Sequence, residues 1–412
     1  MNQYGRGMDP YLNESHLALR HEVRDFAQTE IAPVARELDE QSRFPWETVG
    51  KMADRGWFGA NVPQEYGGRE LDTLSYMLII EELARIDASH AITISAHNTL
   101  GTSPILSFGS ESQKRRYLPL LCGRVLGGFG LTEPGAGSDA AASRTMAIRE
   151  NAGYRITGSK IFITHAGVGE IFVVTAVTER NVGVKGITSF IVTKPTTDRE
   201  AAERAGMGHA PELEPFTTGV RAGKKEDKMG WRASDTRELI LEDARVDEAD
   251  RLGEEGQGFI NFMKTLDAGR IGIGALSLGL AQGAFDTAVE YVGSRERGGQ
   301  PLRDVQGVQF SLADMATEIA AARHLVYHAA SLRQNGQPFA IEAAQAKLYA
   351  SELAMRTTTR AVQLLGAAGY TTEYPVERMM RDAKICEIGE GTSEVQRLVI
   401  GRSLFRAAGT AA

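Results

Sequence analysis

The sequence lacks the features that mark several large classes of protein. Its two cysteines, Cys122 and Cys386, provide neither a disulfide framework nor a cysteine metal site, and they fit a reducing compartment. No apolar run approaches the roughly 20 residues that a membrane-spanning helix needs. The 46 basic and 53 acidic residues are spread along the chain, so no basic segment suggests nucleic acid or an anionic membrane as a partner.

Targeting signals and familiar cofactor motifs are missing as well. The N-terminal segment has no apolar core for a signal peptide, and Asp9 and Glu14 are residues that a transit peptide avoids, so we expect a cytoplasmic protein. There is no Rossmann fingerprint, P-loop, H-E-x-x-H or C-x-x-C, and the histidines are scattered, so we expect no metal site. The glycine pair Gly272 and Gly274 lies in an apolar helical run, where it indicates close helix packing. A dinucleotide would have to bind by another arrangement.

Three successive patterns divide the chain. Residues 1–126 have apolar residues at helical spacing and a capping box at Ser110 and Gln113. Residues 127–247 contain β-rich runs separated by turns at intervals of roughly 8–12 residues, which is typical of a small barrel or sandwich. Within them, residues 195–223 form a polar insert that we interpret as a surface loop with at most one helical turn.

The C-terminal part, residues 248–412, predicts long helices again. The expected spans are 255–296, 304–334, 339–368 and 376–406, joined by short connections that contain glycine. Four long helices with short connectors are typical of an antiparallel bundle. We therefore predict an α+β multidomain fold with an N-terminal all-α domain, a central β domain and a C-terminal four-helix bundle.

A glycine-flanked acid lies near the end of the chain. Glu390 is placed between Gly389 and Gly391, and the residues that follow predict a helix with a capping box of Ser393 and Gln396. The carboxylate is therefore expected on a loop where another molecule can approach the backbone closely. A solvated turn glutamate is the alternative, which the Gly-Glu-Gly pattern alone does not exclude.

Two further stretches suit a flat aromatic ligand. Residues 131–139, LTEPGAGSD, combine glycines with hydroxyls that can hydrogen-bond the edge of a heteroaromatic ring, although an ordinary glycine turn has the same composition. Residues 160–165, KIFITH, form a strand whose alternation puts Phe162 and Thr164 on one face. Taken alone, this stretch is equally a core strand.

Together these segments resemble the acyl-CoA dehydrogenase family across almost the whole chain. LTEPGAGSD is similar to the family's first signature, KIFITHAG to its W-I-T-N strand and LDAGRIGIGALSLGLAQ to its first C-terminal helix. QLLGAAGYTTEYPVERMMRDAKICEIGEGTSEVQRLVIGR is similar to the second signature and the catalytic segment. GKKEDKMGWRASDT and its surroundings resemble the short-chain and branched-chain members most. The family's order of helical, β and helical domains matches the order expected from the residues.

The resemblance implies an enzyme that binds FAD and an acyl-CoA substrate. It assigns Glu390 as the catalytic base, and Ser138, Asp267, Arg270, Gly389 and Gly391 as substrate-binding residues. The implied FAD-binding residues are Phe129, Leu131, Thr132, Gly137, Ser138, Phe162, Ile163, Thr164, Arg295, Gln306, Gln363, Leu364, Leu365, Gly366, Ala367, Thr392, Ser393 and Glu394. In the family, Arg295, Gln306 and the 363–367 segment reach FAD of a neighbouring subunit, which implies a homotetramer built as a dimer of dimers.

The implied reaction is the α,β-dehydrogenation of a short- or branched-chain acyl-CoA to the 2-enoyl-CoA. Glu390 removes the α-proton, the β-hydrogen leaves as a hydride to flavin N5, and an electron-transferring flavoprotein takes up the electrons. Gly389 stands where many straight-chain members carry tyrosine, which implies room for a branched acyl group. An acyl-CoA oxidase that uses O₂ and a weakly active acyl-CoA-binding flavoprotein are the alternatives. Chain length argues against the first, and the retained Glu390 against the second.

A few positions depart from the family's pattern. Phe162 replaces the usual tryptophan, and His165 replaces the asparagine of the same motif. Gly298 stands where phenylalanine is usual, and Ala367-Ala368 interrupts a glycine-rich motif. The insert at residues 195–223 is longer than the family's usual connection. None of these departures removes a catalytic group.

Overall fold

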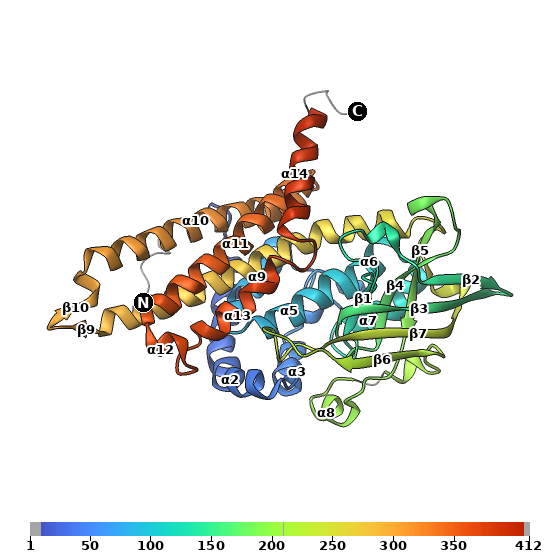
Figure 1. The fold of residues 1–412 in the computed structure, drawn as a ribbon. Coiled ribbons are helices and arrows are strands. Elements are labelled where there is room, and N and C mark those ends of the chain that lie inside the picture. The colour runs from blue at the N-terminus through green and yellow to red at the C-terminus, as the bar shows by residue number, and fades with distance from the viewer. Residues whose placement is uncertain (1–9, 209, 408–412) are drawn as a thin grey trace.

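The computed structural model describes residues 10–208 and 210–407 as three consecutive parts (Figure 1). A helical part comes first, a sheet follows, and a second helical part ends the chain, which confirms the expected fold class. The long helix α9 (Gly258–Ser294) runs from the sheet side to the far end of the helical body. The outer ends of the first and last predicted domains, residues 1–9 and 408–412, lie outside the described residues.

The N-terminal part consists of helices whose starts the sequence marks. Asp72 is the N-cap of α4 and accepts a hydrogen bond from the Ser75 N–H at 2.7 Å. The predicted capping box of Ser110 and Gln113 is confirmed at the start of α7. A π-helical turn over Ala27–Ile31 joins α1 to α2. The helices are α1 (Glu14–Phe26), α2 (Ala32–Gln41), α3 (Trp46–Asp54), α4 (Thr73–Ala84), α5 (Ala88–Ala96), α6 (Ser103–Phe108) and α7 (Glu111–Leu121).

The middle part is a single mixed sheet in the order β6-β7-β3-β2-β4-β5-β8, with β1 added in parallel to β4. The β-rich runs of the sequence are confirmed as strands, and two of them merge into the long strand β3. Within the described residues the sheet does not close into a barrel. The strands are β1 (Gly127–Gly130), β2 (Met146–Glu150), β3 (Gly153–Thr164), β4 (Ile171–Val177), β5 (Ile187–Thr193), β6 (Val220–Lys225), β7 (Thr236–Asp247) and β8 (Arg251–Leu252).

The polar insert at residues 195–223 is more ordered than a surface loop. It contains the short helix α8 (Arg199–Arg204), and the edge strand β6 begins within it. Ala202, Met207 and Leu213 are buried and anchor the segment. Helix α8 and strand β6 were not predicted from the sequence, because the apolar residues of the insert follow no regular period and β6 is largely polar.

The C-terminal part differs from the prediction at its last helix. The expected helix over 376–406 is wrong, because the chain breaks between α13 (Val376–Cys386) and α14 (Ser393–Ala407). Helix α14 projects from the body of the molecule (Figure 1). The other helices are α10 (Gln306–Gln334), α11 (Ala340–Leu365) and the short α12 (Ala367–Tyr370), and a small hairpin of β9 (Glu296–Arg297) and β10 (Gln300–Pro301) precedes α10.

The two helical parts share one core around α9, which packs against α4, α10 and α11. Gly272 and Gly274 lie in the buried stretch of α9, in agreement with their interpretation as packing residues. A buried polar network joins the same helices, because Glu81 of α4 accepts hydrogen bonds from Tyr327 at 2.6 Å and Arg323 at 3.0 Å. In the described residues we find no helix with the length and hydropathy that crossing a bilayer requires.

Candidate active site

Glu390 lies on the loop that separates α13 from α14. Its φ of 53° and the φ of 94° at Gly391 are left-handed, so the chain cannot continue as a helix here. Two side chains fix the loop from inside the protein. Lys347 Nζ and Gln396 Nε2 donate to the carbonyl oxygen of Gly391 at 2.6 Å and 2.8 Å. The loop therefore holds Glu390 in one position at the start of α14.

The predicted capping box of Ser393 and Gln396 is wrong. Thr392 takes the capping role, because its Oγ1 accepts a hydrogen bond from the Val395 N–H at 3.3 Å. Gln396 is used instead to hold the Gly391 carbonyl, and Ser393 Oγ is buried without a hydrogen-bond partner in the described part of the chain. Of the FAD contacts predicted here, Ser393 is buried, Thr392 half-buried and Glu394 exposed.

The Glu390 carboxylate has an environment suited to a base. Its Oε2 atom is buried and has no hydrogen-bond partner among the described residues. Burial raises the pKa of Glu390 to about 7, although the charges of Lys347 and Arg270 oppose that rise. Oε2 lies against Gly269 of α9, where a Cβ atom would overlap it. A carboxylate that is unpartnered and titrates near neutral pH can take up a proton from a bound molecule.

Two predicted substrate residues lie on α9 beside that carboxylate. Arg270 is 2% exposed and forms an ion pair with Asp267, one turn earlier. Burial lowers the pKa of Arg270 and raises that of Asp267, while the charge of each residue opposes the shift of the other. Arg270 lies close enough for the Glu390 charge to raise its pKa, and Asp267 is linked to it through the ion pair. Their predicted role, which is to hold the CoA part of the substrate, stays a prediction.

An acid that the sequence analysis did not single out anchors the loop at residues 131–139. Glu133 is buried and forms an ion pair with Lys160 of β3 at 2.6 Å. It also accepts hydrogen bonds from Ser143 Oγ at 2.6 Å and from two backbone N–H groups at 2.7 and 3.1 Å. Burial alone would raise the pKa of Glu133, but the ammonium of Lys160 and these donors outweigh it and lower the pKa to about 2. Of the predicted contacts on this loop, Gly137 and Ser138 are exposed, and Leu131 and Thr132 are half-buried.

The end of β3 leaves an aromatic ring uncovered next to that loop. Phe162 has a φ of 58° at a β-bulge, and it is 61% exposed. Ile163 is buried and Thr164 half-buried, and the predicted common face of Phe162 and Thr164 stays a prediction because the bulge interrupts the alternation. The Ile161 N–H donates to the Thr132 carbonyl at 2.8 Å and joins strand to loop. An uncovered ring beside exposed glycines and hydroxyls fits a flat ring such as isoalloxazine.

The neighbouring strand β1 is held by residues on both sides. Phe129, a predicted flavin or acyl contact, stacks on Phe262 of α9 with the ring centroids 5.4 Å apart. His165, one of the departures from the family pattern, is buried, and its Nδ1 lies 2.8 Å from the Gly127 carbonyl oxygen. His165 therefore lies within hydrogen-bonding distance of the first residue of β1.

A second group of predicted FAD contacts lies at the far end of the helical body (Figure 1). Arg295 follows α9, Gln306 begins α10, and the 363–367 segment joins α11 to α12. Helix α9 has 37 residues and is therefore roughly 55 Å long. The length of α9 separates these predicted FAD contacts from those on the sheet, such as Phe162. One chain therefore does not bring the two sets of predicted FAD contacts together. In the 363–367 segment, Leu365 is buried, Leu364 is half-buried, and Gln363, Gly366 and Ala367 are exposed.

The sequence analysis missed Lys347 and Gly269, which contact the Glu390 loop or its carboxylate, and it gave Gln396 a capping role in place of its contact with that loop. A signal for Lys347 was present. It lies on the same helical face of α11 as Ala343, Ala350 and Ala354, and all four residues are buried. A lysine on an otherwise apolar face is rarely buried without a reason. Gly269 carries no such signal, because its role depends on a loop far along the chain.

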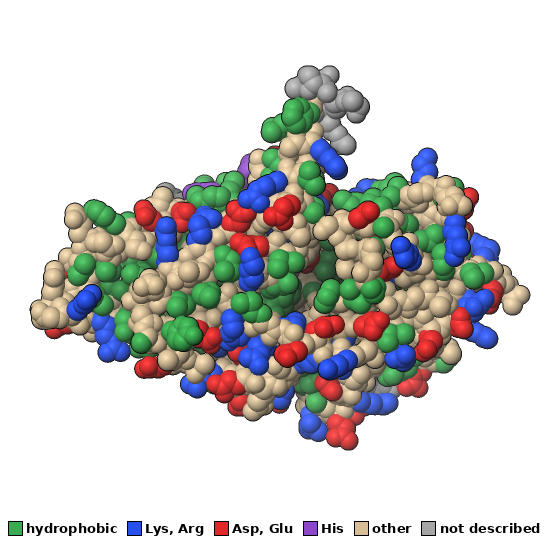
Figure 2. Space-filling view, viewed as in Figure 1, with side chains coloured by type: hydrophobic (Ala, Val, Ile, Leu, Met, Phe, Trp, Pro, Cys, Tyr) green, Lys and Arg blue, Asp and Glu red, His purple; other side chains and the backbone are tan. Residues whose placement is uncertain are grey.

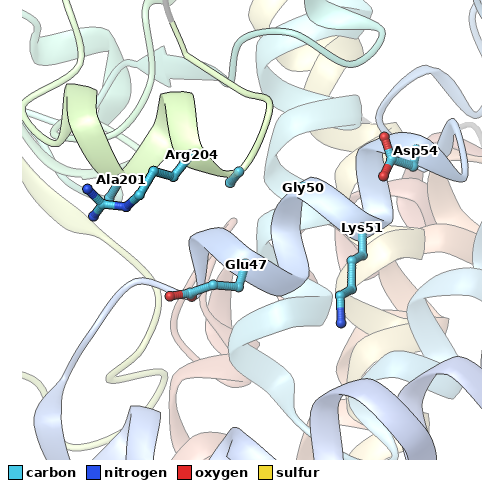
Figure 3. A pocket seen from close by; sticks show the side chains of 7 residues that line it. Glu47, Gly50, Lys51, Asp54, Ala201 and Arg204 are labelled. Atoms are coloured by element: carbon cyan, nitrogen blue, oxygen red, sulfur yellow. The ribbon is translucent and has the colours of Figure 1, made fainter.

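The surface of the described residues is hollowed in several places. Figure 2 shows a hollow at the foot of α14, with hydrophobic side chains around its rim. Another is a cavity of about 350 Å³ between α3 and α8 (Figure 3). Glu47, Lys51, Asp54 and Arg204 are among its lining residues. No predicted site residue lines this charged cavity, so it is not part of the candidate active site.

The fold and the site define a class of three-part proteins, in which a buried carboxylate on a helical body lies beside a sheet domain with an uncovered aromatic ring. Family models for the N-terminal, middle and C-terminal domains of acyl-CoA dehydrogenases match residues 13–124, 128–244 and 256–405. The chain belongs to the acyl-CoA dehydrogenase family and is an oxidoreductase. In the described residues, no group of acidic, histidine and cysteine side chains has the geometry of a metal site.

Similar proteins match nearly end to end. The short-chain specific acyl-CoA dehydrogenase of Clostridium acetobutylicum is 47% identical over 400 residues, which cover 97% of this chain and 100% of that protein. The structure of butyryl-CoA dehydrogenase from Megasphaera elsdenii has a TM-score of 0.89 and 44% identity, and the match covers 96% of this chain and 99% of that one.

Two further solved structures bear on partners and cofactor. One, from work on the electron-transferring flavoprotein of Acidaminococcus fermentans, has a TM-score of 0.90 and 44% identity, and covers 97% of this chain and 100% of its own. The other is an acyl-CoA dehydrogenase of Bacillus anthracis complexed with FAD, with a TM-score of 0.86 and 32% identity. That match covers 98% of this chain and 70% of the other.

Proposed function

We propose that this protein dehydrogenates a short- or branched-chain acyl-CoA thioester between its α and β carbons, with Glu390 as the base. The observation that carries the proposal is the carboxylate of the half-buried Glu390, whose Oε2 atom is buried without a hydrogen-bond partner in the described residues and whose pKa is raised to about 7. A structural ion pair would leave no such free oxygen. The similar short-chain and butyryl-CoA dehydrogenases support a small acyl group.

The chain's own residues would act on the α-proton as follows. The α-proton of a thioester is a weak acid, so its removal needs a nearby base and a donor for the charge that develops on the thioester oxygen. Glu390 supplies the base, and its backbone N–H, on a loop with glycine on both sides, supplies a donor. Each such donor in a dry site contributes roughly 3–4 kcal/mol to the transition state. The hydrogen bonds to the Gly391 carbonyl keep the loop in place while the proton moves.

We propose FAD as the cofactor, held by the uncovered Phe162, by Thr164 and by the loop at residues 131–139. When bound, FAD supplies the acceptor for the β-hydrogen. The similar structure that contains FAD supports this assignment. The buried Ser393 hydroxyl, which has no partner among the described residues, and the N-terminus of α14 offer further polar contacts for an anionic group.

A cofactor site shared between subunits would explain the FAD contacts that are predicted at the far end of α9. Arg295, Gln306 and the 363–367 segment lie at the end of α9 away from the sheet that carries Phe162, and the helix is roughly 55 Å long, so one chain does not bring them to the same cofactor. We therefore propose a homotetramer, a dimer of dimers, in which each FAD also contacts a neighbouring subunit. Leu398, Leu404 and Phe405 on the projecting α14 are 54%, 65% and 63% exposed, and a second copy would cover such apolar residues. If light scattering shows a monomer and that monomer retains full FAD occupancy, this arrangement is wrong.

We propose an electron-transferring flavoprotein as the electron acceptor, supported by the similar structure from work on such a protein. The competing activity is an oxidase that passes electrons to O₂. Rates of flavin reoxidation in air and with an electron-transferring flavoprotein separate the two activities. We expect slow reoxidation in air and fast reoxidation with the flavoprotein.

The direct test of the proposed function is Glu390→Gln. The amide keeps the size of the side chain but cannot take up a proton. We expect the variant to fold, to keep its yellow flavin and to bind acyl-CoA, and to lose anaerobic flavin reduction by at least about a thousandfold. The assay should use a panel from butyryl- to octanoyl-CoA with branched members included. Near-normal flavin reduction in the variant would show that Glu390 is not the base.

A further inference from the structure

Lys347 is a buried cation placed directly beneath the Glu390 loop. It projects from α11, and its side chain is 0% exposed. Its Nζ donates to the Gly391 carbonyl oxygen at 2.6 Å, and it forms no ion pair with a carboxylate of the described residues. A buried ammonium with only a carbonyl as partner is unfavourable compared with an apolar side chain of similar length. Packing alone therefore does not explain a lysine at this position.

Holding the loop does not explain the charge either. Gln396 Nε2 donates to the same carbonyl oxygen at 2.8 Å and is neutral. A second neutral donor at position 347 would complete the same hydrogen bonds without burying a charge. The feature that only lysine adds is a positive charge next to the residue that carries the carboxylate.

We infer that Lys347 is a positioning residue for the proposed base: its ammonium holds the Gly391 carbonyl and favours the ionised form of the Glu390 carboxylate. This inference rests on the proposed function of Glu390. It adds an electrostatic role to the hydrogen bond by which Lys347 already keeps the Glu390 loop in place.

The charges around Glu390 come from several elements and act in opposite directions. Burial raises the pKa of Glu390, while Lys347 of α11 and Arg270 of α9 lower it. The Glu390 charge also contributes to the raised pKa of Tyr76 of α4. Asp267 forms an ion pair with Arg270. Removal of the Lys347 charge would therefore raise the pKa of Glu390, so a larger fraction of the base would be protonated at neutral pH.

Lys347 is still charged at the pH where half of Glu390 has ionised. Burial lowers the pKa of Lys347 to about 8, and the neighbouring Cys386, Glu390 and Glu387 limit this shift while Arg270 adds to it. That value lies above the pKa of about 7 for Glu390. The ammonium is therefore charged near pH 7, where half of Glu390 has lost its proton, and it is half neutral near pH 8.

The test compares three variants that separate charge from hydrogen bonding. Lys347→Met removes both and is an apolar replacement that a buried site accepts. Lys347→Arg keeps the charge. Gln396→Met removes a neutral donor to the same oxygen and is the matched control. The measurements are kcat/KM from about pH 5 to about pH 9, which reports ionisations of the free enzyme, together with flavin content and thermal stability.

In Lys347→Met we expect the acidic limb of the pH profile to move up by about one unit or more, so that activity at pH 6 falls at least tenfold relative to activity at pH 9. Gln396→Met should lower activity by the same factor at every pH, and Lys347→Arg should keep the wild-type limb. If Lys347→Met loses its flavin or does not fold, Lys347→Gln provides the same comparison with a donor retained.

An unmoved acidic limb in the folded, flavin-loaded Met or Gln variant would overturn the inference. A merely structural role would lower activity without moving that limb. The outcome is distinguishable from failure of the proposed function. If wild-type protein fails to reduce its flavin with any acyl-CoA, or if Glu390→Gln retains that activity, the proposed base is wrong and the inference falls with it.

Discussion

Gly269 of α9 leaves the space that the carboxylate of Glu390 occupies. A Cβ atom at position 269 would overlap Oε2 of Glu390, and no backbone atom lies as close. The atom displaced by a side chain here would thus be the end of a flexible side chain, not part of the fold. A helix and a loop that are distant in sequence together determine where the proposed base lies.

Gly269→Ala is therefore expected to separate stability from activity. Alanine favours a helix over glycine by up to about 1 kcal/mol, so the variant should fold and keep its flavin. The new methyl group should displace the carboxylate, and anaerobic flavin reduction by butyryl-CoA should fall at least about tenfold. Gly293→Ala is the matched control, because it lies in the same helix and its Cβ would meet open space. Equal activities of the two variants would show that the carboxylate does not need this position.

The raised pKa of Glu390 predicts a pH-dependent cost in stability. Because the folded protein holds the proton up to about pH 7, ionisation of Glu390 destabilises the fold as pH rises from about 4.5 to about 7. Glu390→Gln removes that cost. In urea unfolding without bound flavin, the variant should exceed wild type by up to about 3 kcal/mol above pH 7. The difference should shrink toward pH 4.5, and a difference that does not vary with pH would contradict the assignment.

The helical parts were predictable because their signals are local. Caps such as Asp72 and Ser110 and regular apolar spacing mark helix starts within a few residues. The glycines around Glu390 predicted a loop before the last helix, but the expected span 376–406 ran across it because apolar residues continue on both sides. The left-handed backbone at Glu390 and Gly391 confirms the break. The edge strand β6 was missed because an exposed edge needs few apolar residues.

The residues of the candidate site likewise include some that the local sequence signals and some that come together only through packing. Glu390 was identifiable because its flanking glycines are its immediate neighbours. Gly269 and Lys347 contact its carboxylate or its loop only through helix packing, and no spacing in the sequence encodes that contact. The bulge at Phe162 was likewise hidden, since register shifts depend on the partner strand.

The buried ion pair of Glu133 and Lys160 should support the loop at residues 131–139, which we propose as an FAD contact. Glu133→Gln leaves the Lys160 ammonium without its ion-pair partner, which typically costs about 3–5 kcal/mol. We expect a loss of this order in urea unfolding and weaker FAD binding by flavin fluorescence. The double variant Glu133→Gln/Lys160→Met should recover part of the stability but not the FAD affinity.

An exposed pair in the same sheet provides the control for that experiment. Arg221 and Glu242 are 57% and 68% exposed, and Glu242→Gln should cost less than about 1 kcal/mol. If Glu133→Gln costs no more than this exposed change, the buried pair does not anchor the loop.

Gly389 should determine whether the acyl pocket accepts a branch. The nearest atoms that a Cβ at this position would meet belong to Ile385, at 3.5 Å and 3.9 Å, which is ordinary contact. A side chain is therefore compatible with the backbone, and we expect its absence to leave room beside the proposed base. A methyl branch in that space would gain roughly 1–3 kcal/mol of transition-state binding, enough for a tenfold or larger preference.

Gly389→Tyr should fill that space. We expect kcat/KM for isobutyryl-, isovaleryl- and 2-methylbutyryl-CoA to fall relative to that for butyryl- and octanoyl-CoA, by about tenfold in the ratio. Gly389→Ala, which adds only a methyl group, should keep most of the wild-type ratio and controls for loop stiffening. If the tyrosine variant folds, binds flavin and shows an unchanged ratio of branched to straight substrates, another side chain already fills the space and Gly389 only shapes the loop.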